Sequence, residues 1–325
     1  MQTDRRRINA PPGGTSAPVF AFEGCENLRR RPTRTRNADE HRKIFLRTGV
    51  VPSASGSAYY EVPPQEPNTS SKSLVPSSSN LKITCTVHGP RPLPRSAAFS
   101  PNLLLSTHVK FAPFATRERR GYVRDSSERD LGVHLETALR GVVIGERWPK
   151  SGCEVVITVL EGEEDGWWGD RQRSEKAGGW GMISVLGACI TVASAALVDA
   201  GIDCVDLVSG GVAALVQESS EAKTRIILDP CPCEHDFKAA CVVGYLQARD
   251  EVTGMWMKRD AGDETEALID QAIKAASLTR TVLAEAVKEA TELKGATSLE
   301  ESKEANGEMK SAGRNIKGKD VVMTC

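Results

Sequence analysis

A run of residues without a single charge, Ala177 to Val198, limits the possible folds more than any other part of the sequence. It is long enough to cross a bilayer as one helix, since about 20 apolar residues suffice. However, its residues are mainly Gly, Ala, Ser, Thr and Val, basic residues flank it on one side only, and Asp199 to Gly201 is typical of a helix end. We therefore predict a helix from Gly181 to Ala200 that is buried between layers of a soluble domain, with no membrane contact.

Residues 107–161 form a second unit with a clear plan. An extended apolar run containing Val109, Phe111 and Phe114 predicts a strand that leads into the basic segment Arg117–Gly121. Apolar side chains at helical spacing follow and must be buried against another layer. These side chains are Leu131, Leu135, Leu139 and Val142.

The ends of this predicted helix, and the strand after it, are also marked in the sequence. Ser127 can serve as the N-cap, with the Glu128 carboxylate in the first turn, where it suits the positive end of the helix dipole. Gly145 is the predicted helix end. The run Glu154–Leu160 is apolar and β-branched nearly throughout, which predicts a strand inside a sheet.

The rest of the chain adds strands and one long helix. A hairpin is predicted from Gly56–Glu61 and Leu81–Val87, and a final helix from Asp263 to Gly295. Because most neighbouring strands are joined by hairpins, we expect an α+β fold with mixed sheets packed on central helices. The further predicted strands are Val205–Ala213, Thr224–Asp229, Ala240–Leu246 and Gly254–Met257.

We expect one folded domain, residues 34–294, with additions at both ends. Residues 1–33 mix Pro, Gly and Arg with few apolar residues, which predicts a flexible basic arm. Residues 295–325 are rich in Lys, Glu and Gly, which predicts a disordered tail. Residues 63–80 are too long and too rich in Pro and Ser for a hairpin loop, so we expect an exposed insertion.

A polar, glycine-rich loop is predicted at residues 162–180. Its two adjacent tryptophans, Trp167 and Trp168, have two explanations. They could stack on nucleic-acid bases, or cover a neighbouring protein surface, which is the explanation we favour.

Composition narrows the functional classes. The formal net charge is -1 at pH 7, which excludes a protein that coats nucleic acid over its whole surface and leaves only local basic patches. Cysteines are scattered through apolar segments and no secretory leader precedes them, so we expect a reducing compartment.

Two groups of side chains that could be reactive have little support in the sequence as functional sites. Cys231, Cys233 and His235, with Cys241 further on, offer ligands that zinc prefers, but one residue between the first two cysteines departs from the common C-x2-4-C spacing, so we expect no metal. His134 lies on the polar side of its predicted helix and is most simply a surface residue. No nucleophile-elbow motif supports a hydrolase, and no cofactor is expected.

Several of these segments, taken in order, resemble one known family. The hairpin Gly56–Glu61 with Val87–Arg91, the segment Lys110–Arg120, the stretch Ala195–Ile202 with Val205–Gly210, and the strand end Ile227–Asp229 carry the likeness. They resemble the RNase PH fold, which is ribosomal protein S5 domain 2-like, of phosphate-dependent exoribonucleases and of ring subunits of the eukaryotic RNA exosome. The resemblance covers residues 34–294 and implies that fold here.

The resemblance also locates two features that phosphorolysis needs. Phosphate must be held by an arginine and backbone donors at a helix N-terminus, and a carboxylate must hold a divalent cation. Active relatives have Gly-Thr-Arg at the buried helix, where this chain has Ser184, Val185 and Leu186. The expected later acidic residue falls at Ala239 or Ala240. The resemblance therefore implies a non-catalytic subunit of the RNA exosome ring.

Two other functions stay open. An active phosphate-dependent 3'-5' exoribonuclease of the RNase PH type would have to use a relocated carboxylate, such as Glu234 or Asp236. A free-standing acyl or nucleotide enzyme of α+β type has no phosphate loop or coupled nucleophile to support it.

From charge spacing alone, the basic segment is a solvated loop or a subunit-interface patch, but the resemblance implies contact with single-stranded RNA through phosphates. The candidate RNA-binding residues are Lys110, Arg117, Arg119, Arg120 and Arg124. The resemblance further implies other RNase PH-like ring subunits and OB-type cap subunits as partners. It implies a location in the nucleus and nucleolus and also in the cytoplasm.

Overall fold

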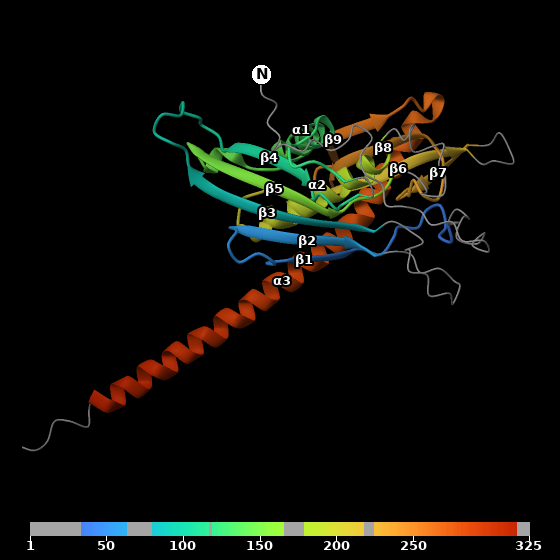
Figure 1. Ribbon diagram of the computed structural model, residues 1–325. Coiled ribbons are helices and arrows are strands. Elements are labelled where there is room, and N and C mark those ends of the chain that lie inside the picture. Colours follow the sequence, from blue (N-terminus) through green and yellow to red (C-terminus); the bar gives the residue numbers. More distant parts are fainter. Residues whose placement is uncertain (1–33, 64–79, 117–118, 166–178, 218–223, 317–325) are drawn as a thin grey trace, which may run out of the picture.

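The computed structural model of the chain describes residues 34–63, 80–116, 119–165, 179–217 and 224–316, with side chains described as far as Gly295. Two β-sheets form the body (Figure 1). The first has the strand order β1-β2-β3-β5-β4 and the second the order β7-β6-β8-β9. The strands are β1 (Phe45–Thr48), β2 (Gly56–Val62), β3 (Leu81–Pro92), β4 (Leu104–Phe111), β5 (Ser151–Glu161), β6 (Val208–Gln217), β7 (Thr224–Leu228), β8 (Phe237–Leu246) and β9 (Glu251–Lys258).

The strand pairing in both sheets matches the predicted α+β class. Paired strands are antiparallel except β4 and β5, which run parallel with a helix between them in sequence. The strand that carries the apolar run Glu154–Leu160, β5, lies between β3 and β4, as its composition predicted. The predicted α+β fold with mixed sheets on central helices is confirmed.

Helix α2 (Gly181–Asp199) lies between the two sheets, against β2 and β3 on one side and β6 and β8 on the other. Every residue from Ile183 to Leu197 is buried. Among the described helices, α2 alone is long and apolar enough to cross a bilayer, and 89% of its apolar window is buried inside the protein. The prediction of a core helix is confirmed.

The central strand β6 is squeezed between α2 and the last helix, α3 (Thr265–Ile316). A Cβ atom on Gly210 would lie 2.0 Å from the Gly187 carbonyl oxygen of α2, and one on Gly211 would lie 2.1 Å from the Ala272 carbonyl oxygen of α3. No side chain fits at either position, so the two successive glycines allow helices to approach β6 from both faces.

Helix α1 (Ser126–Arg140) joins β4 to β5, and its ends differ from the prediction. The Asp125 carboxylate accepts a hydrogen bond from the Glu128 amide at 2.8 Å, and the Glu128 carboxylate accepts one from the Asp125 amide at 3.1 Å, which is a reciprocal capping box. Ser127 was the wrong choice of cap, because its hydroxyl donates to Asp125 instead.

The end of α1 comes earlier than predicted. The helix ends at Arg140 with Gly141 as its C-cap, because the chain turns away to pair Val143 with Cys204 in an isolated bridge. Gly145, the predicted end, instead begins a short 3₁₀ turn, Gly145–Arg147.

Helix α3 packs on the second sheet and then projects far from the body (Figure 1). It begins at Thr265, after a 3₁₀ turn at Gly262–Glu264, and runs through Gly295 to Ile316. The predicted end at Gly295 is wrong: nothing lies within 4 Å of a Cβ built there, and glycine in an exposed helix costs only about 1 kcal/mol relative to alanine.

Several predictions fall outside the described residues. These concern the arm at 1–33, the inner part of the insertion at 64–79, the loop at 166–178 with its two tryptophans, and the last residues, 317–325. The proposed domain limits at 34 and 294 remain predictions.

Candidate functional site

The N-terminus of α2, where the resemblance places the phosphate clamp, is filled by groups of the chain itself. The Asp165 carboxylate accepts hydrogen bonds from the amides of Gly181 at 2.8 Å and Gly179 at 3.1 Å. The buried Ser184 hydroxyl donates to the Pro230 carbonyl at 3.3 Å. Free amides at a helix N-terminus attract anions, so Asp165 occupies the position that a phosphate would need.

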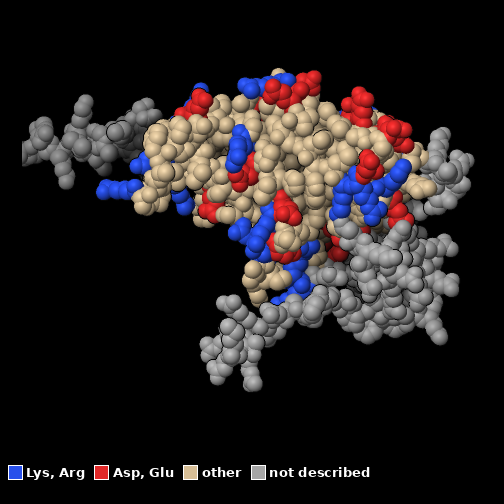
Figure 2. Space-filling model, turned by 90° about the horizontal axis from the view of Figure 1, so that it is seen from above, with Lys and Arg blue, Asp and Glu red and all other residues tan. Residues whose placement is uncertain are grey.

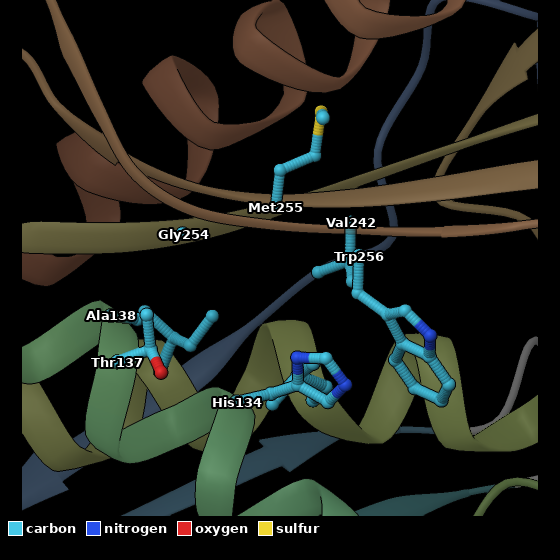
Figure 3. Close-up of a pocket in the computed structure, with 9 residues that line it drawn as sticks. His134, Thr137, Ala138, Val242, Gly254, Met255 and Trp256 are labelled. Carbon is cyan, nitrogen blue, oxygen red and sulfur yellow. The ribbon is translucent and has the colours of Figure 1, made fainter.

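A small cleft between α1, α2, β8 and β9 is shown in Figure 3, and its lining includes Leu186, at the expected arginine position. The cleft volume is about 30 Å³. Its lining includes Ile190 and Val242, and its polar members are His134 and Thr137. The cleft has no arginine or lysine in its lining to hold a phosphate.

His134 is not the simple surface residue that the sequence predicted. Its ring is stacked on Trp256 of β9, with 4.9 Å between the ring centroids and 17° between the planes. The polar side of α1 at this point faces the edge of the second sheet, which the helical pattern alone does not show.

A buried charge cluster lies beside the start of α2. It consists of Arg34, Arg36, Arg42, Glu163, Asp229 and Glu234, three arginines and three carboxylates whose formal charges cancel. Every one of these side chains is at most 8% exposed. The arginines precede β1, whereas the carboxylates follow β5 and β7, so the cluster fastens the start of the domain to its core.

The contacts inside the buried charge cluster are direct. Arg42 donates through Nε and Nη2 to the two Asp229 oxygens at 2.7 and 2.8 Å, and through Nη1 to Glu163 at 2.9 Å. Arg36 donates to Asp229 at 3.0 Å and to Glu234 at 3.2 Å. The guanidinium and carboxylate groups are in contact with each other, which leaves no space for an anion between them.

The electrostatics of Asp229 follow from this geometry. Burial alone would raise the pKa of its carboxyl, but the Arg42 guanidinium, together with His41 and Arg36, holds that pKa well below its usual range. The same contacts with Asp229 and Glu163 overcome burial and raise the pKa of Arg42. Asp229 is therefore a permanent counter-ion in the cluster.

The expected metal-carboxylate position lies in the sheet core. Ala239 and Ala240 in β8 are 0% and 1% exposed and pair with Leu215 and Ala214 of β6. Of the nearby acids, Glu234 belongs to the buried charge cluster, and Asp236 is exposed.

Two thiols of the cysteine grouping, Cys231 and Cys241, have raised pKa values. A hydrogen bond with Cys233 and burial raise the pKa of the Cys231 thiol, and burial raises the pKa of Cys241 to about 11. Within the described ranges, no group of three or more His, Cys, Asp or Glu residues is arranged to hold a metal ion.

We call residues 112–125, between β4 and α1, the basic loop. The structure ties two of its predicted RNA contacts, Lys110 at its base and Arg120, into the protein. Lys110 Nζ contacts the buried Glu128 carboxylate at 2.8 Å and donates to the Gly121 carbonyl at 2.9 Å. Arg120 pairs with Asp125 at 3.1 Å and lies 4.3 Å from the centre of the Phe111 ring. Both cations therefore hold the loop in shape.

The other candidates in the basic loop differ. Arg119 and Arg124 are exposed, whereas Arg117 lies outside the described residues. Arg124 donates to His108 Nδ1 at 2.7 Å, and His108 Nε2 lies 3.3 Å from the Glu154 carboxylate. Acidic and basic side chains are interspersed on the face seen in Figure 2.

With this geometry in hand, the chain can be compared with known proteins. The model of the 3' exoribonuclease family, RNase PH domain 1, matches residues 40–203, about half of the chain. The chain belongs to the RNase PH family. The matched residues span the first sheet, α1 and α2. They therefore include the basic loop and the start of α2.

The most similar relatives carry one name. The chain is 51% identical over 294 residues to the exosome complex component MTR3 of Chaetomium thermophilum, covering 88% of this chain and 99% of that protein. It is 31% identical over 285 residues to the exosome complex component mtr3 of Schizosaccharomyces pombe, covering 86% and 94%. These matches agree with a likeness of Asp4–Ile8 and Pro32–Gly49 to the ring subunit called mRNA transport regulator.

A solved structure supports the fold of this RNase PH family member. The crystal structure of rice Rrp46 superimposes with a TM-score of 0.56 over 78% of this chain and 98% of that chain, at 17% identity. The predicted RNase PH-like fold is confirmed.

Sequence reasoning missed three features of the site. Phe114 was placed in one extended run with Val109 and Phe111, but β4 ends at Phe111, just before Pro113, and Phe114 is 75% exposed. The partnership of His108 with Arg124 joins a strand to a loop and has no local signature. The buried charge cluster was also missed, because its arginines and carboxylates are far apart in sequence.

Proposed function

We propose that this chain is a non-catalytic, structural subunit of the RNA exosome ring, where it helps form the channel that carries single-stranded RNA to 3'-5' degradation and processing, including ribosomal RNA maturation. Membership of the RNase PH family and the extended similarity to exosome components named MTR3 support the ring assignment. The absence of catalysis is an inference from the site.

One observation carries the non-catalytic part: Asp165 already occupies the amides at the start of α2. A phosphate dianion would have to displace this carboxylate and would find Leu186 where a guanidinium should be. Loss of such a charged contact costs several kcal/mol of transition-state stabilisation, on the order of 3–4 kcal/mol for one donor.

The alternative, an active phosphorolytic exonuclease, needs a free carboxylate and a free arginine. Glu234 is used by Arg36, and Arg42 is used by Asp229 and Glu163. Freeing either arginine would leave buried charges without partners, which is costly. The geometry therefore favours the structural role over a relocated active site.

The proposed partners are other RNase PH-like ring subunits, OB-type cap subunits and single-stranded RNA. The proposed location follows from that assembly: nucleus and nucleolus, and also cytoplasm. The candidate RNA contacts are those of the basic loop, of which Arg119 and Arg124 are the exposed ones in the described part.

The activity test uses the purified chain, alone and assembled with its partners, incubated with single-stranded RNA, inorganic phosphate and Mg²⁺. We expect no nucleoside diphosphate from the chain alone. Release of nucleoside diphosphate by the purified chain alone would refute the non-catalytic assignment. Native mass spectrometry of a pull-down tests the ring, and a stable lone monomer would contradict it.

A further inference from the structure

The basic loop exposes large apolar side chains that the proposed ring function does not explain. Phe114, Tyr122 and Val123 are 75%, 83% and 80% exposed. Single exposed apolar residues are ordinary on protein surfaces. Three exposed apolar side chains on one loop, two of them aromatic, indicate a surface that binds a ligand.

Hydrogen bonds hold the backbone of the described parts of this loop, residues 112–116 and 119–125. Lys110 Nζ donates to the carbonyls of Gly121 at 2.9 Å and Val123 at 3.4 Å, so it holds the backbone on both sides of Tyr122. The Arg120 amide donates to the Pro113 carbonyl at 3.2 Å, which joins the two limbs of the loop next to Phe114. A ligand would therefore meet aromatic rings whose backbone is already ordered, which reduces the entropy lost on binding.

The charges around the rings indicate the kind of ligand. Two described acids near the loop are engaged within the protein: Glu128 pairs with Lys110, and Asp125 pairs with Arg120 and caps α1. In the part of the chain that the structure describes, no carboxylate pairs with Arg119 or Arg124. Exposed aromatic side chains on the same loop as exposed cations suit a ligand with planar bases on a polyanionic backbone.

We propose that Tyr122 and Phe114 form a base-stacking site for single-stranded RNA, with Arg119 and Arg124 contacting the adjoining phosphates. This inference rests on the proposed ring function and specifies which atoms of the RNA this subunit binds. A protein partner could cover Val123 equally well, but it would have to supply separate acids for the two arginines.

The test separates bases from backbone. The full-length chain, assembled with its ring partners, is titrated with a fluorescent single-stranded RNA and with the same RNA carrying an abasic stretch. Tyr122→Ala should weaken binding of the normal RNA about tenfold and leave the abasic RNA unchanged, because stacking needs the base. Phe114→Ala should act in the same direction, and Tyr122→Phe, which keeps the ring, should retain affinity.

The matched control is Val133→Ala, which truncates an apolar side chain that is 63% exposed on α1. It should change neither affinity. Equal losses for normal and abasic RNA in Tyr122→Ala would overturn the stacking site. So would unchanged RNA affinity combined with impaired ring assembly, which would assign the rings to a protein interface.

Failure of the wild-type chain to join a ring would contradict the proposed function instead. In that case the same two RNAs are titrated against the chain alone, and binding that does not depend on the bases overturns the inference.

Discussion

In the buried charge cluster, each arginine from residues 34–42 meets a carboxylate of the folded core, whereas in the basic loop Arg119 and Arg124 reach solvent without one in the described part of the chain. Guanidinium groups serve both regions, with opposite consequences. In the buried charge cluster, carboxylates in direct contact neutralise the arginines and stabilise the fold. In the basic loop, Arg119 and Arg124 remain available to bind a ligand. The position of carboxylates, more than the number of arginines, separates a structural site from a binding site.

The largest expected effect comes from breaking the inner region. Asp229→Asn would leave Arg36 and Arg42 buried without their shared counter-ion and should lower the free energy of unfolding by about 3–5 kcal/mol. Urea unfolding followed by circular dichroism measures the change. Asp270→Asn, at an exposed position on α3, is the control and should stay within about 0.5 kcal/mol of wild type. A loss as small as the control's would show that the cluster is not a structural clamp.

Lowering the pH should also reveal the contribution of Asp229 to stability. Since the pKa of Asp229 is held well below its usual value of 3.8, its stabilising contribution is fully present above that value and is lost as pH falls through the folded-state pKa. Unfolding measured between pH 2 and 7 should show stability falling below about pH 4 in wild type. The fall should be shallower in Asp229→Asn, and identical acid limbs in both proteins would contradict this assignment.

A smaller loss of stability is expected at the base of the basic loop. Lys110→Met removes the partner of Glu128, whose side chain is 1% exposed, and should cost about 1–3 kcal/mol of stability. It should leave the salt dependence of RNA binding unchanged, because Lys110 is used inside the loop. Arg140→Met, an exposed cation at the far end of α1, is the control and should be nearly neutral. If Lys110→Met instead flattens the salt dependence, Lys110 contacts RNA directly.

The smallest effect on folding should come from the outer region. Arg119→Glu with Arg124→Glu should change stability by no more than about 0.5 kcal/mol. In the assembled ring it should weaken RNA retention and reduce the slope of log affinity against log salt concentration by about 0.7 for each lost phosphate contact. Electrophoretic or fluorescence titrations over a range of salt measure both. An unchanged slope with intact assembly would remove these residues from the RNA path.

Prediction from the sequence worked where a pattern was local and strong. The uncharged run predicted α2, which is buried on nearly all sides, and the extended apolar runs predicted β5 and the hairpin strands, which each bury one face fully. It failed at helix ends, where Asp125 and Ser127 are both competent caps and only the capping box with Glu128 selects one. Tertiary pairing ended α1 before Gly145, and no local signal required α3 to stop at Gly295.

The candidate site was predictable only in part. The resemblance predicts that Leu186 stands at the arginine position and Ala239 or Ala240 at the position of the later acid. The sequence did not predict that Asp165 accepts hydrogen bonds from the amides at the start of α2. Among the cations of the basic loop, the sequence treated Lys110 and Arg124 alike. Only the positions of Glu128 and Asp125 show that Lys110 and Arg120 are engaged in holding the loop.

The long-range nature of the buried charge cluster also bears on how the chain is made. Arg42 and Asp229 are 187 residues apart. At a synthesis rate of about 5–20 residues per second, a ribosome would release Arg42 on the order of ten seconds or more before Asp229. Until Asp229 is made, Arg42 has only Glu163 among the carboxylates of the cluster, and Arg34 and Arg36 have none of theirs. The segment from Arg34 to Arg42 can therefore complete its ionic contacts only after Asp229 and Glu234 have been made, and a polypeptide that stops before Asp229 cannot form them.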